Sequence, residues 1–179
     1  MLSKNAVKYS KLFFTMADGT SFFVKTCVYR YDLSLSWRKS PRVGVKLIYG
    51  IGTDIVEVAH IEAAITQFGD DMAKRILAES EWESYEASNI KARFLAKRFA
   101  AKEAFSKALG TGLRAPATFQ NIAVTHDELG KPMLLLAPDL TAWMQQKNIQ
   151  HTHISISDEK NLAAAFVVLE VWIKFLIRK

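Results

Sequence analysis

Two stretches of the sequence combine residue types that handle phosphate groups and divalent metal ions. The first, GIGTDIVEV, begins at Gly50 and contains the carboxylate of Asp54 shortly after two glycines. A carboxylate beside glycines, where a ligand can approach the backbone, often holds a hard cation such as Mg²⁺. The second, RFAAKEAFSKALGTG, begins at Arg98 and contains one acid, Glu103, among basic residues. Phosphate binding needs cations and metal binding needs the acid, so both kinds of ligand are expected at these stretches.

Each stretch also has an interpretation that involves no chemistry. Asp54 precedes a predicted helix and is a common residue type for a helix N-cap. Glu103 and Lys107 are four residues apart, a spacing that gives a surface ion pair of roughly 0.3–0.5 kcal/mol on a helix. That pair leaves Arg98 unexplained, because it lies four residues after Phe94 and so shares the apolar face. A guanidinium there must extend to solvent or find an anion.

Three weaker signals lie further along the chain. Gly110-Thr111-Gly112 is a glycine-rich loop whose backbone N–H groups could surround a phosphate. Lys131 follows Gly130 in a short turn, where it is either a phosphate contact or a solvated loop tip. His151 and His153 alternate on a predicted strand and share a face, but without a third ligand they are a weak metal site.

The apolar periodicity predicts which elements carry these residues. A short apolar run predicts a buried strand over residues 47–51 that ends at Gly52, with Asp54 just beyond it. The longest helix is predicted over residues 92–109 with Gly110 as terminator, and it has Glu103 and Lys107 opposite most of its apolar residues. The other predicted elements are helices over 58–68, 70–77, 80–87 (opening with a capping-box pattern of Ser80 and Glu83) and 140–146, a hairpin of strands over 121–125 and 132–136, and strands over 152–157 and 162–169.

Composition and charge indicate one globular domain preceded by a basic segment. Half of the 179 residues are apolar, and Cys27 is the only cysteine, which excludes an internal disulfide and fits the cytoplasm. The net charge is +6 overall, but residues 1–46 carry +7 and the remainder −1, so the charge is a property of the first segment. We therefore expect a domain over residues 47–170 between two extensions, 1–46 and 171–179, with no transmembrane segment.

The order GIGTDIVEV, RFAAKEAFSKALGTG and ELGKP, followed by a Ser/Thr-rich strand and an apolar strand, resembles the bacterial holo-[acyl-carrier-protein] synthase family. The resemblance covers residues 47–170. It implies an α+β fold, the 4′-phosphopantetheinyl transferase fold, with a small antiparallel sheet packed against helices. It also implies a homotrimer with active sites at subunit boundaries, where one subunit supplies the GTD side and its neighbour the KE helix.

The activity that the resemblance implies is transfer of 4′-phosphopantetheine from coenzyme A to a serine of an apo acyl carrier protein, with release of adenosine 3′,5′-bisphosphate. Mg²⁺ would lie between Asp54 and Glu103, with Lys107 as a further member of the catalytic group. The proton acceptor would be Glu103, a water on the metal that it positions, or another nearby group. The residues expected to contact coenzyme A are Arg98, Lys102 and Lys107, with Ser106, Gly110, Thr111, Gly112 and Lys131 as weaker candidates.

Three features depart from the family pattern. His60 stands where many relatives have Arg, on the helix that resembles the docking surface for the acidic carrier, and a neutral His weakens that attraction. Asp158 stands where many relatives have His. Residues 1–46 have no counterpart, and one hypothesis is that translation starts near Val43 or Val45. The rival function is a noncatalytic protein that binds nucleic acid or a membrane surface through this basic arm; the family resemblance argues against both partners.

Overall fold

The computed structural model describes residues 8–15, 21–28 and 44–174. The chain divides into two compact units, Met1–Pro41 and Arg42–Lys179. In the first unit, β1 (Lys8–Thr15) and β2 (Ser21–Val28) form an antiparallel hairpin in which Lys8 pairs with Val28 and Thr15 with Ser21. This hairpin is not evident from the sequence, because the apolar clusters of the segment follow no sustained period.

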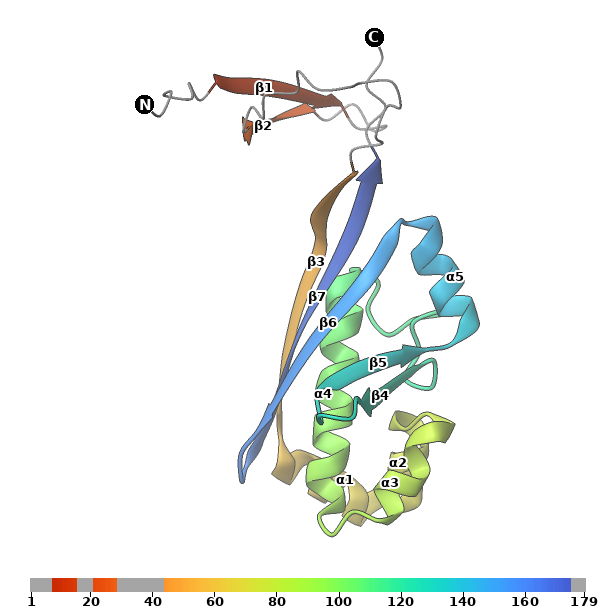
Figure 1. Ribbon diagram of the computed structural model, residues 1–179. Coiled ribbons are helices and arrows are strands. Elements are labelled where there is room, and N and C mark those ends of the chain that lie inside the picture. The colour runs from red at the N-terminus through yellow and green to blue at the C-terminus, as the bar shows by residue number, and fades with distance from the viewer. Residues whose placement is uncertain (1–7, 16–20, 29–43, 175–179) are drawn as a thin grey trace. The chain divides into compact units, whose positions relative to one another are not determined.

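The second unit is built on a three-stranded antiparallel sheet and one long helix (Figure 1). The strands β3 (Gly44–Glu57), β7 (Leu162–Lys174) and β6 (Ile149–Asp158) lie side by side in that order. The helix α4 (Lys91–Leu109) runs along one face of the sheet. Alternate residues of β7 are buried on this inner face, and they are Ala163, Ala165, Val167 and Leu169. The core of the unit therefore lies between this sheet and α4.

Short elements connect the sheet to the helix at either end. Between β3 and α4 lie α1 (Val58–Phe68), α2 (Asp70–Ile76), the 3₁₀ turn η1 (Glu79–Glu81) and α3 (Trp82–Glu86). Between α4 and β6 lie the hairpin of β4 (Ile122–His126) and β5 (Pro132–Leu136), then α5 (Pro138–Gln146). The predicted α+β class is confirmed. None of the helices described has the length and apolarity needed to cross a membrane.

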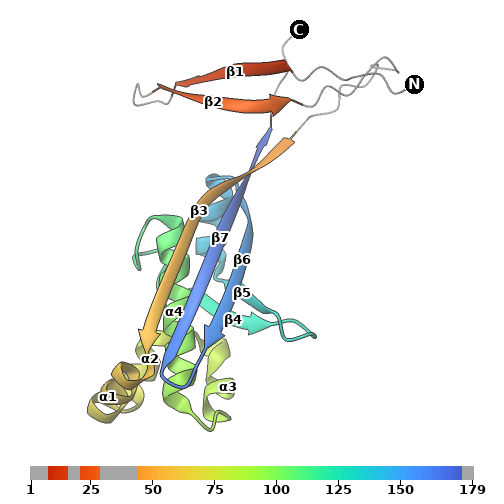
Figure 2. The ribbon, with the colours of Figure 1, turned by 90° about the vertical axis from the view of Figure 1, so that its left-hand side faces the viewer.

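The outer face of the sheet, which is turned away from α4 (Figure 2), carries several exposed apolar side chains on β3 and β7. Ile51 and Ile55 of β3 and Phe166 of β7 expose 54%, 68% and 47% of their surfaces. Thr53 pairs with Phe166 in the β3–β7 register, so these residues form one continuous surface. No described element of this unit lies over it.

Four boundaries differ from the sequence predictions. The first strand continues through Gly52 to Glu57, so Asp54 lies within β3 and pairs with Ala165, instead of just beyond a strand over residues 47–51. The predicted capping box of Ser80 and Glu83 is wrong, because η1 begins one residue earlier and the Ala78 N–H donates to the Glu81 carboxylate at 2.9 Å. The expected boundary after residue 46 falls inside β3, and β7 extends to Lys174.

Gly50 and Gly52 let β3 pack directly on the backbone of α4. A Cβ atom at Gly50 would overlap the carbonyl of Ala108, and one at Gly52 would overlap the carbonyl of Ala104. The two glycines therefore do not end the strand. They remove the side chains that would otherwise hold β3 away from the helix, and Asp54 follows on the same inner face.

Gly52→Ala is expected to lower the free energy of unfolding by about 2–4 kcal/mol, because the added methyl group must push β3 away from α4. Urea unfolding followed by circular dichroism measures this. The control is Thr125→Ala at an exposed position of β4, where only a small loss of strand propensity is expected. Equal midpoints for the two variants would contradict the close contact.

Candidate active site

Asp54 and Lys107 meet where β3 packs on α4. The Lys107 ammonium donates to Asp54 Oδ1 at 2.7 Å and to the Thr53 carbonyl at 3.2 Å. The Asp54 side chain is 14% exposed and that of Lys107 is 50% exposed. A largely buried carboxylate is thus held by a cation that solvent can reach.

This contact contradicts both interpretations that involved no chemistry. Asp54 is not a helix cap, because α1 is preceded by Glu57 at its N-cap position and no side chain caps it. Lys107 takes Asp54 as its ion-pair partner among the described residues, and not Glu103. The two motifs are therefore joined by a direct contact across 53 residues of sequence.

Glu103 lies one turn before Lys107 on α4 and is partly exposed. The hydroxyl of Ser106 donates to the Glu103 carbonyl at 2.9 Å and lies 3.4 Å from Glu103 Oε2. Asp54, Glu103 and Lys107 thus belong to one region of a single chain. Within one chain, β3 and α4 pack together, so the GTD strand already meets the KE helix of its own subunit; the sharing of a site between subunits stays a prediction.

The carboxylates of Asp54 and Glu103 fit the requirements of Mg²⁺. This ion prefers oxygen ligands and is commonly held by one or two carboxylates, with water and substrate phosphates completing its shell. The ammonium of Lys107 already occupies a cation position on Asp54. Across the described ranges no cluster of three or more His, Cys, Asp or Glu residues suits a metal, and His153 instead lies 3.2 Å from Glu170 Oε2.

The glycine-rich loop begins directly after the turn that carries Lys107. Gly110 adopts the left-handed conformation, with φ 75°, and its N–H donates to the Lys107 carbonyl at 3.0 Å. Gly112 also has a positive φ of 64°, and the Thr111 hydroxyl donates to its carbonyl at 2.9 Å. No atom lies within 4 Å of a Cβ position at either glycine. The loop is therefore open beside Lys107, as a ligand-binding loop requires.

A second group of charged residues surrounds a cavity of about 250 Å³ between α4, the β4–β5 turn and the end of β6. We call it the basic cavity; it is lined by Phe94, Lys97, Arg98, His126, Gly130, Pro132, Ile156 and Asp158. Asp158 Oδ2 lies 3.5 Å from the Lys97 ammonium. Burial, and then the nearby charges of Arg98 and Lys97, lower the pKa of His126. The lining thus favours an anion.

Two other predicted residues lie at the surface. Lys131 is exposed beside Gly130 of the cavity wall, and its backbone N–H donates to Asp127 Oδ1 at 2.8 Å. The side-chain ammonium of Lys131 takes no part in this hydrogen bond. His60 lies on the exposed side of α1, where its Nε2 is 3.6 Å from Glu57 Oε2.

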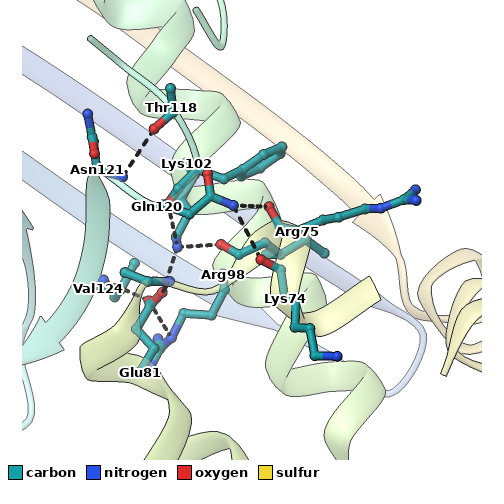
Figure 3. Close-up of polar contacts among 12 residues, drawn as sticks. Lys74, Arg75, Glu81, Arg98, Lys102, Thr118, Gln120, Asn121 and Val124 are labelled. Carbon is teal, nitrogen blue, oxygen red and sulfur yellow. Dashed lines mark hydrogen bonds and ion pairs between the residues drawn. The ribbon is translucent and has the colours of Figure 1, made fainter. Parts of the chain in front are cut away.

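Lys102 is fully buried, and Figure 3 shows its polar contacts. Its ammonium donates to the Ile76 carbonyl at 2.6 Å, to Glu81 Oε2 at 2.5 Å and to the Phe119 carbonyl at 2.9 Å. All three of its N–H donors are used inside the protein. In this conformation Lys102 therefore has no N–H donor left for the expected contact with coenzyme A, because position 102 faces the core, four residues after Arg98.

Arg98 has the anionic partner that its place on the apolar face requires. It is 5% exposed, its Cζ lies 4.4 Å from the centre of the Phe94 ring, and its Nε lies 3.2 Å from Glu81 Oε1. Nε nevertheless makes no hydrogen bond, so the contact between Arg98 and Glu81 is an ion pair without a hydrogen bond. Burial lowers the pKa of Arg98, and Glu81 opposes that shift.

Sequence reasoning missed Glu81, Lys97 and His126. A usable signal for Glu81 was present, since two cations four residues apart on the buried side of a helix require a buried acid. Lys97 and His126 come together only through the fold, because β4 and α4 are separated in sequence.

Lys102→Met is expected to remove a pH dependence of stability. Burial lowers the pKa of Lys102 to about 8, from 10.5. Between these two pH values the unfolded chain still holds the proton on Lys102, whereas the folded chain has lost it. The unfolding free energy of the wild type should therefore rise by roughly 2 kcal/mol from pH 8 to pH 10, compared with that of Lys102→Met. Urea unfolding of both proteins at the two pH values measures the difference; parallel curves would contradict the assignment.

Comparisons with known proteins agree with these observations. Residues 50–167 match the model of the 4′-phosphopantetheinyl transferase superfamily. The holo-[acyl-carrier-protein] synthase of Nitrosomonas europaea is 54% identical over 124 residues, which is 69% of this chain and 99% of that protein. The corresponding enzyme of Vibrio cholerae is 48% identical over 124 residues, 69% of this chain and 98% of that protein.

Solved structures give the same result. The crystal structure of the Neisseria meningitidis holo-[acyl-carrier-protein] synthase is 45% identical, with a TM-score of 0.67, and the match covers 69% of this chain and 98% of that one. The Bacillus anthracis enzyme in complex with CoA (3′,5′-ADP) is 39% identical, with a TM-score of 0.58 and coverage of 69% and 97%. Together with the family match, these similarities mean that the chain belongs to the 4′-phosphopantetheinyl transferase superfamily, in its holo-[acyl-carrier-protein] synthase (AcpS-type) family.

Proposed function

We propose that this chain transfers 4′-phosphopantetheine from coenzyme A to a serine hydroxyl of an apo acyl carrier protein, giving the holo carrier for fatty acid biosynthesis and adenosine 3′,5′-bisphosphate. The observation that carries the proposal is the contact of Asp54 with Lys107, beside Glu103. It unites the two motifs that could hold a metal and a phosphate, in a chain 54% identical to a holo-[acyl-carrier-protein] synthase.

In this reaction the serine oxygen forms a bond to the β-phosphorus of coenzyme A, and the bond from that phosphorus to the bridging oxygen breaks. The serine proton passes to Glu103 or to another acceptor beside it, and the leaving adenosine bisphosphate carries away the bridging oxygen. Such a transfer depends on positioning and on neutralisation of phosphate charge. Lys107, and a metal ion held by Asp54 and Glu103, would neutralise this phosphate charge.

The described residues divide this work between them. Asp54 and Glu103 would hold Mg²⁺, which supplies Lewis acidity toward the pyrophosphate oxygens when bound. Lys107 is half-exposed, so its ammonium can leave Asp54 and contact a phosphate oxygen. Arg98, with Lys97 and His126 nearby, is the proposed contact for a further phosphate of coenzyme A in the basic cavity. Ser106 steadies Glu103, and the loop from Gly110 to Gly112 offers backbone N–H groups.

We also propose a homotrimer with substrates bound near the subunit boundaries, as the family resemblance implies. The exposed apolar outer face of the sheet supports this assembly. Contiguous apolar surface of this kind marks an interaction site in most proteins. Three copies packed through Ile51, Ile55 and Phe166 would remove it from water.

The rival function, a noncatalytic protein that binds nucleic acid or membrane through a basic arm, is not favoured. The excess positive charge lies in residues 1–46, whereas the family match covers residues 50–167. We propose the cytoplasm as the site of action, as the single cysteine and the coenzyme A substrate suggest.

Asp54→Ala and Glu103→Ala are each expected to slow carrier modification about 100-fold or more, because each removes charge stabilisation at the reacting phosphate. Intact-mass spectrometry of an apo carrier protein, incubated with enzyme, Mg²⁺ and coenzyme A, detects the added phosphopantetheine arm. Glu86→Ala, which removes an exposed carboxylate at the end of α3, is the matched control and should keep the wild-type rate. Wild-type rates in both site variants would refute the metal pair.

Phe166→Asp is expected to separate the assembly into single chains, because it puts a charge in the middle of the apolar outer face. Light scattering after size-exclusion chromatography should give three times the chain mass of 20.2 kDa for the wild type and the single-chain mass for the variant. Leu129→Asp, at a residue 95% exposed in the β4–β5 turn, is the control and should stay trimeric. A monomeric wild type would contradict the assembly.

A further inference from the structure

We propose that Glu81 is a positioning residue, which holds Arg98 at the wall of the basic cavity with its outer nitrogens directed to an anionic ligand. The inference rests on the proposed function, because it takes the phosphate-bearing nucleotide of coenzyme A as that ligand. Glu81 lies outside the GTD and KE motifs, and acts through Arg98.

Glu81 is itself fixed in place by the backbone. It is 2% exposed, and each of its carboxylate oxygens has one backbone and one cationic neighbour (Figure 3). Oε1 accepts a hydrogen bond from the Val124 N–H at 2.9 Å and lies 3.2 Å from Arg98 Nε. Oε2 accepts from the Ala78 N–H at 2.9 Å and from the Lys102 ammonium at 2.5 Å. The carboxylate is therefore a rigid reference point between η1, β4 and α4.

The same contacts fix the guanidinium of Arg98. Its Cζ lies 4.4 Å from the Phe94 ring centre, while Glu81 approaches from the side of Nε. A guanidinium carries five N–H donors, and four of them are on the two Nη atoms. Glu81 lies beside the inner nitrogen, which leaves the Nη donors for another anion. Arg98 and Phe94 both line the basic cavity, so such an anion has space to enter.

The charge balance of the buried group points the same way. One acid, Glu81, neighbours two cations, Arg98 and Lys102, both of them almost completely buried. Lys102 donates its other two hydrogen bonds to carbonyl groups, which carry no charge. The cluster thus keeps one positive charge, and Arg98 is its member at the cavity. Asp158, the carboxylate in the cavity lining, is near Lys97. A phosphate bound in the basic cavity would neutralise this remaining positive charge.

Preorganisation of this kind raises affinity, because the ligand does not have to order a long flexible side chain. The test is isothermal titration of adenosine 3′,5′-bisphosphate into the full-length protein without added metal. Glu81→Gln keeps the size of the side chain and removes its charge. We expect it to weaken nucleotide binding about tenfold, and Arg98→Met to weaken it at least as much. In the Glu81→Gln/Arg98→Met double variant, Kd should equal that of Arg98→Met alone, because Glu81 acts only through Arg98.

A purely structural role for Glu81 would give different results. Ile122→Ala, a cavity variant at a fully buried position of β4, is the stability control. It should lower the thermal midpoint while the folded protein keeps the wild-type Kd. If Glu81→Gln fails to fold, Glu81→Asp replaces it; the shorter side chain keeps the charge but withdraws it from Arg98, and a weaker Kd is again expected.

The outcomes separate this inference from the proposed function. A wild-type Kd in Glu81→Gln, or a further loss when Glu81→Gln is added to Arg98→Met, overturns the positioning role. A wild-type Kd in Arg98→Met overturns both the positioning role and the phosphate contact of Arg98. Neither result touches the transfer reaction, which is read separately from the mass of the carrier protein.

Discussion

The direct contact between the backbones of β3 and α4 is the constraint on which the rest of this structure depends. A strand normally packs on a helix through side chains, which keep the two backbones apart. Gly50 and Gly52 remove those side chains, and any Cβ there would overlap the carbonyls of Ala108 and Ala104. Only at this short distance does Asp54, the next inward residue, lie within 2.7 Å of the Lys107 ammonium. The glycines of the first motif therefore serve the contact as much as any ligand.

The helix that carries Glu103 and Lys107 also buries two of its cations in the core, where a single acid balances them in part. Residues four apart on α4, Arg98 and Lys102, are both nearly inaccessible to solvent. Two buried cations without an acid would favour unfolding strongly, because each loses its hydration. Glu81 supplies the acid and accepts hydrogen bonds from the backbone N–H groups of residues 78 and 124, while the carbonyls of residues 76 and 119 accept from Lys102. The polar cluster thus ties α2, η1 and β4 to the same helix that carries Glu103.

The sequence allowed good predictions where local chemistry decides the outcome. The helix over 92–109 and its terminator Gly110 follow from periodicity and left-handed glycine geometry, and the structure has α4 at Lys91–Leu109. The strand bearing Asp54 was predicted too short, because Gly52 was interpreted as an end signal although its role is tertiary. Lys102 was assigned to the ligand and Glu81 was missed for a related reason. The two residues pair with each other across 21 residues of sequence, and although buried cations call for an acid, no local pattern identifies which acid it is. The order of strands in the sheet likewise depends on long-range pairing.

The three-stranded sheet has two faces with opposite requirements, and β3 satisfies both by alternation. Its inner positions are glycine, glycine and aspartate, which allow close packing and leave one carboxylate beside α4. Its outer positions at this end include the exposed Ile51 and Ile55 on either side of Thr53. Successive residues of a strand point to opposite faces, so a shift of one residue in the β3–β7 register would exchange the two sets. Isoleucine would then meet the helix backbone and Asp54 would face outward. The register of this one strand pair therefore decides both which face Asp54 occupies and where the exposed isoleucines lie. A change that shifts the register would alter the two faces together.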